Sequence, residues 1–221
     1  MSPVRHIIAL CLLAFVAVTP SMAAECSPAL TAHEERLADQ VGMDKDVLLM
    51  VREEARNDLH RMIGYDENGY QILGAGVVVS VSRGRTDSVL RSLRERLRPR
   101  KYLAFLIEIN DAIKRDKIGV IRGTDQFDIL QVMHTNGEDN DVSHEEVVER
   151  LRVWEKKNPF DIIGAENDWV EIQFRKVPSD LKALAEEVSD FSPDAVDEGA
   201  GSIADLMKEI AATKRLLLFW H

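Results

Sequence analysis

An acidic turn between two histidines is the first feature of this sequence whose residue types could support chemistry. His134 and His144 stand on either side of Asp139 and Asp141. Carboxylates suit Ca²⁺ or Mn²⁺ and imidazoles suit Zn²⁺ or Ni²⁺, so these four residues are a candidate metal site. Their spacing matches neither an EF-hand nor a zincin motif, and a polar turn before a helix explains Asn136–Glu146 equally well. We therefore predict no cofactor.

A second candidate site lies near the end of the chain. Its members are acidic or C-terminal residues: Asp190, Asp194, Asp197, Glu198, Trp220 and His221. Crowded carboxylates can share acid and base roles, because crowding raises the pKa of one while its neighbour stays charged. Pro193 and Gly199 equally predict a plain connection between two helices. The acidic turn and this segment support one alternative function, a metal- or carboxylate-dependent hydrolase whose catalytic residues stay unassigned.

The third candidate is a basic stretch between residues 83 and 101. It holds eight basic residues, although the whole chain has 28 Lys and Arg against 38 Asp and Glu. The candidate anion- or partner-binding residues lie in this stretch: Arg83, Arg85, Arg91, Arg94 and Arg98. The last three recur on one helical face opposite a row of leucines, and the start of that helix favours an anion. The same arginines could instead pair with the chain's own acids.

These charges favour an interaction module over an enzyme. The expected partner is another protein or an anionic surface, with a phosphorylated ligand as a further possibility. Nucleic acid is not expected, because the chain is acidic overall and its basic stretch lacks interleaved aromatic residues. Gly74-Ala75-Gly76 precedes a strand, whereas a dinucleotide-binding loop follows one, and neither Ser202 nor Cys26 stands in a nucleophile motif.

Hydrophobic periodicity predicts the elements that position the basic stretch. The expected order in this half is a helical region, a turn, a strand, an amphipathic helix and two strands: Thr31–Ile63, Asn68-Gly69, Val77–Ser82, Asp87–Leu97, Tyr102–Ile109 and Lys117–Arg122. The order strand, helix, strand, strand found between residues 77 and 122 occurs again after residue 127, so the two halves could be related repeats. No Pro-, Gly- or Ser-rich linker separates them, which favours one α+β domain.

The second half predicts a strand, a helix, two strands, two helices and a final strand. The expected strands are Phe127–His134, Phe160–Ala165, Trp169–Val177 and Leu216–Trp220. The helices begin at a capping box of Ser143 with Glu146, after Pro178, and at Ser202. This order resembles a split βαβ, ferredoxin-like unit with one extra helix. We expect an α+β fold with a mixed or antiparallel sheet and helices packed on one face.

The first 24 residues read as a secretory signal peptide. A basic start precedes the apolar run Ile7–Val18, and small residues follow, with cleavage after Ala23 or Ala24. Lipidation is disfavoured because Glu25 precedes Cys26. We see no transmembrane segment after cleavage, so we expect a soluble periplasmic or secreted protein of bacterial type. The expected division is 1–24 signal peptide, 25–118 N-terminal region and 119–221 C-terminal domain.

The C-terminal half resembles a known family. The short motifs that carry the likeness are Phe127-Asp128-Ile129-Leu130, Ile162-Ile163-Gly164-Ala165, Asp168-Trp169-Val170 and Pro178-Ser179-Asp180-Leu181. The more specific positions are Phe191, Ser192, Pro193, Asp194, Glu198, Gly199, Trp220 and His221. Together they resemble the domain of unknown function 4253 family. The family has no established activity, so the resemblance implies no catalytic residue.

This chain departs from the family at three of these places. The family usually has Cys where this chain has Ser192, Gln where it has Glu198, and a Trp-Trp-Asp ending where it has Phe219-Trp220-His221. If those positions form a site in relatives, the resemblance implies that the site has changed here.

Overall fold

The computed structural model describes residues 29–110 and 112–220, beginning with two helices where the sequence predicts one helical region. α1 (Ala32–Val41) starts at a capping box of Thr31 with Glu34 and ends at Gly42, whose φ of 65° is left-handed. α2 (Lys45–Ala55) ends at Arg56, also left-handed. The last part of the predicted helical region is a strand, β1 (Leu59–Tyr65). The apolar spacing alone did not reveal that the helical region is interrupted at Gly42 and ends at Arg56.

The rest of the N-terminal half follows the prediction closely. A turn at Gly69 joins β1 to the long strand β2. The elements that follow are β2 (Gln71–Ser82), η1 (Arg83–Arg85), α3 (Thr86–Leu97), η2 (Arg98–Arg100), β3 (Tyr102–Asn110) and β4 (Arg115–Arg122). α3 is amphipathic because Leu90, Leu93 and Leu97 are buried while its arginines lie on the other faces.

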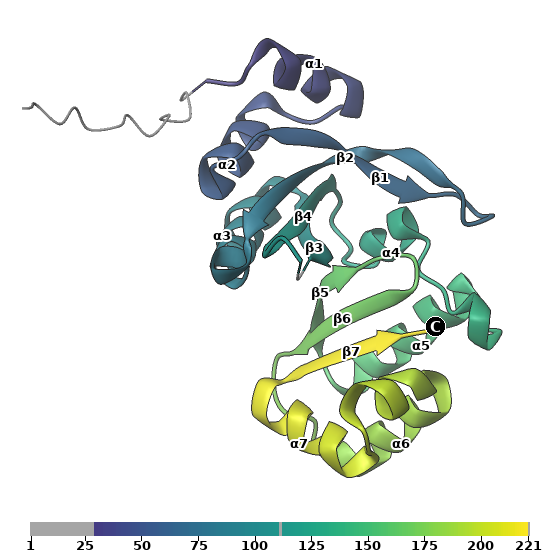
Figure 1. Ribbon diagram of the computed structural model, residues 1–221. Helices are drawn as coiled ribbons and strands as arrows, with labels where there is room; N and C mark the ends of the chain where they lie inside the picture. Colours follow the sequence, from purple (N-terminus) through teal and green to yellow (C-terminus); the bar gives the residue numbers. More distant parts are fainter. Residues whose placement is uncertain (1–28, 111, 221) are drawn as a thin grey trace, which may run out of the picture.

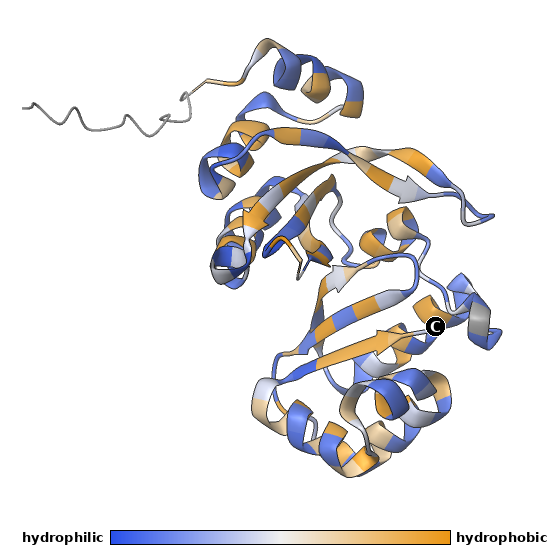
Figure 2. Ribbon diagram, viewed as in Figure 1, coloured by the Kyte–Doolittle hydropathy of each residue, from blue (hydrophilic) through white to orange (hydrophobic). Residues whose placement is uncertain are grey.

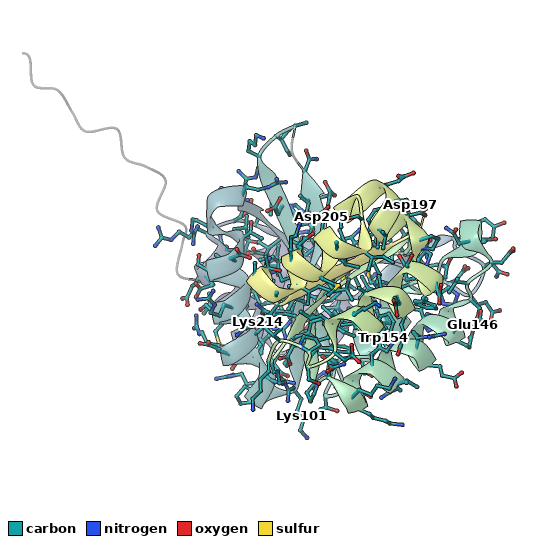
Figure 3. The ribbon with its side chains drawn as sticks, turned by 90° about the horizontal axis from the view of Figure 1, so that it is seen from below. Lys101, Glu146, Trp154, Asp197, Asp205 and Lys214 are labelled. Atoms are coloured by element: carbon teal, nitrogen blue, oxygen red, sulfur yellow. The ribbon has the colours of Figure 1, made fainter. Side chains whose placement is uncertain are left out.

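The C-terminal half contains four helices, two short helical turns and three strands within the described residues. Its elements are α4 (Asp128–Met133), η3 (Glu138–Asn140), α5 (His144–Lys157), β5 (Phe160–Ala165), β6 (Trp169–Phe174), α6 (Leu181–Phe191), the π-helical η4 (Ala195–Ala200), α7 (Ile203–Thr213) and β7 (Arg215–Phe219). The Ser143–Glu146 capping box is confirmed at the start of α5. Figure 3 views α7 from below, with Asp205 near its start and Lys214 directly after its end.

All seven described strands form one mixed sheet in the order β1-β2-β4-β3-β5-β6-β7 (Figure 1). Every neighbouring pair is antiparallel except β3 and β5, which run parallel and pair at Leu106 and Gly164. The α+β class and the mixed sheet are therefore confirmed. The parallel contact is the seam that joins the two halves of the chain.

Two hydrophobic cores lie on opposite faces of this sheet. On β3, Tyr102 and Ala104 belong to the core under α1–α3, while Leu103 and Phe105 belong to the core shared with α4–α7. Successive strand residues point to opposite faces, so β3 contributes to both. Figure 2 shows the resulting pattern, with apolar bands alternating along the strands. The helices of the C-terminal half pack on one face, but helices cover both faces of the whole sheet, so the expectation of one helical face holds for the C-terminal half alone.

The split βαβ prediction needs a correction. Phe127–His134, expected as a strand, contains helix α4. Carboxylates set up this helix locally: Asp125 accepts from the Phe127 N–H at 3.1 Å, and Asp128 accepts from the Thr124 N–H at 3.2 Å. Moreover, β4 is antiparallel to β3 while β5 is parallel to it, so the strands flanking β3 run antiparallel to each other. A split βαβ unit needs them parallel.

Across the described residues, no helix is both long enough and apolar enough to cross a membrane. The predicted signal peptide lies outside those residues.

Candidate functional site

A cleft of about 560 Å³ separates α3 from the strands of the C-terminal half. We call it the arginine cleft, and its lining residues are Asp87, Leu90, Arg91, Arg94, Glu95, Arg98, Pro99, Asp161, Ile163, Gln173 and Arg215. This volume is typical of small-ligand sites, which often lie where two parts of a fold meet. Here one wall is helix α3 and the other wall is the exposed side of β5–β7.

Helix α3 positions three of the predicted arginines in this cleft. Arg91 and Arg94 lie within α3, and Arg98 directly follows its last residue. Their spacings of three and four residues place all three on one side of the helix axis. Arg94 reaches furthest inward: its Nη1 donates to the Ile162 carbonyl at 2.5 Å, and its side chain is 23% exposed. Burial lowers the pKa of Arg94, although the nearby Asp161 opposes that effect. Arg91 is exposed and has no hydrogen-bond or ion-pair partner among the described residues.

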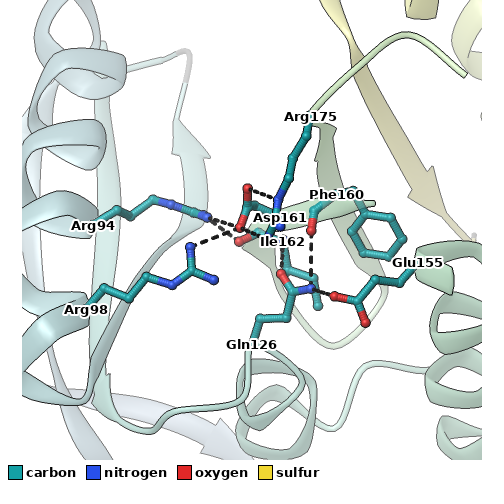
Figure 4. Close-up of polar contacts among 8 residues, drawn as sticks. All are labelled: Arg94, Arg98, Gln126, Glu155, Phe160, Asp161, Ile162 and Arg175. Carbon is teal, nitrogen blue, oxygen red and sulfur yellow. Dashed lines mark hydrogen bonds and ion pairs between the residues drawn. The ribbon is translucent and has the colours of Figure 1, made fainter. Parts of the chain in front are cut away.

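Asp161 is the central carboxylate of the cleft, and three guanidinium groups surround it (Figure 4). Its Oδ1 lies 3.6 Å from Arg94, 3.2 Å from Arg98 and 3.3 Å from Arg175. Burial alone would raise the pKa of Asp161, but the hydrogen bond from Arg175 and the three positive charges hold it below its ordinary value. One negative charge against three positive ones leaves a local excess of positive charge.

A buried glutamine holds the strand that carries Asp161. The Oε1 atom of Gln126 accepts from the Ile162 N–H at 2.8 Å, and its Nε2 donates to Glu155 at 2.5 Å and to the Phe160 carbonyl at 3.3 Å. The backbone on both sides of Asp161 is therefore fixed (Figure 4). This arrangement presents the carboxylate to the arginines with little freedom to move.

The other end of the cleft is closed by a second arginine network. Arg215 of β7 lies 2.8 Å from Asp87 in the first turn of α3 and 3.5 Å from Glu171 of β6. Glu171 is mostly buried, and burial raises its pKa although the Arg215 charge opposes the shift. Arg215 faces two carboxylates, so this end has no surplus of positive charge, and the positive excess lies at the Asp161 end.

The other two predicted arginines lie outside the cleft. Arg83 pairs with the buried Asp116 at 3.0 Å, and Arg85 donates to the Glu54 carbonyl at 2.8 Å. Both therefore join α3 to neighbouring elements. The alternative interpretation, that the basic residues pair with the chain's own acids, holds for Arg83 and also for Arg94 and Arg98, which pair with Asp161. Arg85 instead binds backbone carbonyls.

Sequence reasoning missed four residues of this site: Gln126, Asp161, Arg175 and Arg215. One signal was available for two of them. Asp161 pairs with Gln173 in the β5–β6 hairpin, which places Arg175 diagonally beside Asp161. The approach of α3 depends on the pairing of β3 with β5, for which the sequence has no local signal.

The predicted metal residues lie around the η3 turn. The rings of His134 and His144 stack with centroids 4.6 Å apart, and the Nδ1 of His144 is 3.0 Å from the Thr135 carbonyl, to which it can donate. Asp141 ends the turn in a left-handed conformation. The side chain of Asp139 is not described. No group of three or more His, Cys, Asp or Glu residues suited to a metal ion occurs among the described residues, and the predicted set stays a prediction.

The C-terminal family positions come together with this acidic turn. Asn140 of η3 donates to Asp194 at 3.1 Å, and the Trp220 ring packs so closely on Gly137 that an added Cβ there would lie 2.5 Å from it. Ser192 donates its hydroxyl to the Phe219 carbonyl at 2.9 Å and accepts from the Phe219 N–H at 3.2 Å. These contacts join the end of β7 to Ser192, which follows α6, and to the η3 turn.

The remaining family positions add to the same packing. Phe191 meets the Trp220 ring edge-on at 5.6 Å, and Pro193 lies between Phe191 and η4. In η4, Gly199 approaches the Phe219 ring, while Glu198 is exposed. His221 lies outside the described residues. The described family positions thus form a structural junction.

Comparison with known protein families gives a match to the C-terminal half of the chain. Residues 117–221 match the family model described as Domain of unknown function (DUF4253). The predicted resemblance of the C-terminal half to that family is therefore confirmed. Searches among curated proteins and among solved structures found no match. The matched part carries Asp161, Arg175 and Arg215 but not α3, so the arginine cleft combines the matched region with the preceding half of the chain.

Proposed function

We propose that this protein is a binding module whose arginine cleft receives the phosphate or carboxylate groups of an anionic partner. One observation carries the proposal: Asp161 lines a cavity of ligand size together with Arg94 and Arg98, and it also pairs with a third guanidinium group, that of Arg175, beside the cavity. Arg98 and Arg175 are more than half exposed, so part of their hydrogen-bonding capacity faces the solvent. Guanidinium groups bind both kinds of anion through paired N–H donors.

Titration calorimetry with inorganic tripolyphosphate and with citrate tests this proposal at constant ionic strength. Arg94→Gln and Arg98→Gln should each weaken binding by about tenfold, the equivalent of one charge-assisted contact of about 1.4 kcal/mol. Arg96→Gln is the matched control, because it removes the same charge from the same helix but Arg96 pairs with Glu54 outside the cleft. Comparison of the two probes separates phosphate recognition from carboxylate recognition.

An equal loss of affinity in all three variants would contradict the proposal. Such a result would mean that the anions respond to net charge alone, which acts at long range and is screened by salt.

We also propose that the protein acts after export. The basic start, the apolar run Ile7–Val18 and the small residues up to Ala24 support export and cleavage. Expression of the full chain in a Gram-negative host should yield a periplasmic product. Its intact mass should equal that of a chain whose first residue is Ala24 or Glu25. A product that keeps Met1 and stays in the cytoplasm would contradict this proposal.

A further inference from the structure

A second cavity opens where β3 runs past its contact with β5. These two strands pair at Leu106 with Gly164, and β3 continues beyond that point to Asn110. Beyond that point lies an apolar pocket of about 520 Å³, lined by Ile107, Glu108, Ile109, Glu166, Trp169, Leu217 and Phe219. None of these residues lines the arginine cleft. The pocket is therefore a separate place on the molecule.

The walls of the apolar pocket combine aliphatic and aromatic side chains. Ile109 is 52% exposed and Leu217 is 43% exposed, so apolar surface remains open to solvent. Trp169 lies across Gly164, where an added Cβ would be 2.8 Å from its ring, and this contact fixes the indole at the base of β6. A ligand that covers these side chains is favoured because it removes their apolar surface from water.

Two carboxylates give the pocket a negative rim. Glu166 accepts from the Tyr65 hydroxyl and from the Asn167 N–H, both at 2.5 Å, while Glu108 accepts from Asn110 at 3.0 Å and from Lys117. Burial raises the pKa of Glu166; the hydrogen bonds from Tyr65 and Asn167 oppose the rise, and the negative charges of Asp168 and Glu108 add to it. A positive charge placed beside Glu166 would relieve this crowding.

The neighbouring hollow shows why the positive charge belongs in the apolar pocket. That hollow shares Ile107, Glu108 and Glu166 with it, but its own lining already includes Arg61 and Lys117. Among the described residues, those that line the apolar pocket include no Lys, Arg or His. Glu108 and Glu166 therefore face basic side chains on the side of the neighbouring hollow and apolar side chains on the side of the apolar pocket.

We propose that the apolar pocket binds an organic cation with an apolar body, such as an alkylammonium group. The ammonium group would lie at the Glu166 and Glu108 carboxylates, and the hydrocarbon would lie against Leu217 and Phe219. Trp169 adds attraction for a cation through its ring face. The carboxylates exclude anionic ligands of the same shape, because burying a second negative charge beside them is costly.

Tryptophan fluorescence tests the proposal directly, because Trp169 lines the pocket whereas Trp154 and Trp220 are buried. The probes are hexylammonium, 1-hexanol and hexanoate at pH 7 and equal ionic strength. Hexylammonium should shift the emission with an affinity at least tenfold higher than that of 1-hexanol, and hexanoate should cause no shift. Trp169→Phe should abolish the signal.

Removal of one carboxylate should remove the preference. Glu166→Gln keeps an oxygen for the Tyr65 hydroxyl, and it should bring the affinities for hexylammonium and 1-hexanol to within about threefold of each other. Glu149→Gln, at an exposed position on α5, is the control and should leave the tenfold preference for hexylammonium intact. Glu108→Gln serves as a second variant if Glu166→Gln does not fold. Equal binding of 1-hexanol and hexylammonium by the wild type, or no shift with any probe, would overturn the proposal.

Discussion

Replacing Trp220 with alanine is expected to lower the free energy of unfolding by about 4 kcal/mol. The side chain is 2% exposed, and its ring touches the Gly137 backbone and the edge of Phe191. Its Nε1 also donates to the Phe191 carbonyl at 3.0 Å. The substitution would leave a large cavity where the end of the sheet, the acidic turn and α6 meet.

Denaturant unfolding at 25 °C measures this loss. Trp220→Phe separates the contributions, since it keeps an aromatic ring in the cavity but removes the hydrogen bond, and we expect it to cost about 1–2 kcal/mol. A loss below about 1 kcal/mol in Trp220→Ala would show that the family positions at the C-terminus do not form the junction described above.

Replacing Asp161 with asparagine is expected to destabilise the protein and strengthen anion binding at the same time. The substitution removes the one negative charge that faces Arg94, Arg98 and Arg175. We expect a loss of about 2 kcal/mol in the absence of ligand, because charge-assisted hydrogen bonds contribute about 1.5–3 kcal/mol. An anion in the cleft would then replace the missing carboxylate, so tripolyphosphate affinity should rise about tenfold.

Thermal unfolding with and without tripolyphosphate checks both effects. Tm should fall by roughly 4–8 °C without ligand, and the anion should raise it more in the variant than in the wild type. Asp125→Asn is the matched control, because Asp125 also pairs with an arginine, Arg152, but lies outside the cleft. A variant whose stability and anion affinity both equal those of the control would contradict the role given to Asp161.

The effect of Asp161 on stability should depend on pH in a defined direction. Burial alone would raise its pKa, yet the arginines hold it below the ordinary value of 3.8. A carboxyl group whose pKa is lowered by folding stabilises the protein above its unfolded pKa, and this contribution is lost as the pH falls through the folded pKa. The stability difference between wild type and Asp161→Asn should therefore narrow below about pH 4.

Local patterns in the sequence predicted those parts of the fold that local interactions determine. The leucines of α3, the capping box at Ser143 and the alternation along β6 each depend on neighbours within a few residues, and each is confirmed. α4 was missed because a six-residue helix is too short to show helical periodicity, and the apolar residues at 127, 129 and 133 also fit a strand.

The candidate site could be predicted only in part, for a related reason. Arg91, Arg94 and Arg98 lie in α3 or directly after its last residue, so their spacing was visible in the sequence. Asp161 lies more than sixty residues away, and it meets them because the parallel contact between β3 and β5 places it opposite α3. Such a contact depends on long-range packing, which leaves no local periodic signal.

The location of a bound anion is the sharpest test of anion binding in the arginine cleft. We would determine a crystal structure of the protein with tungstate, a phosphate mimic whose anomalous scattering marks its position without ambiguity. We predict an ion in the arginine cleft within hydrogen-bond distance of Arg94, Arg98 or Arg175, and its loss in the Arg94→Gln and Arg98→Gln variants. An empty cleft at a tungstate concentration that saturates binding in solution would contradict the account.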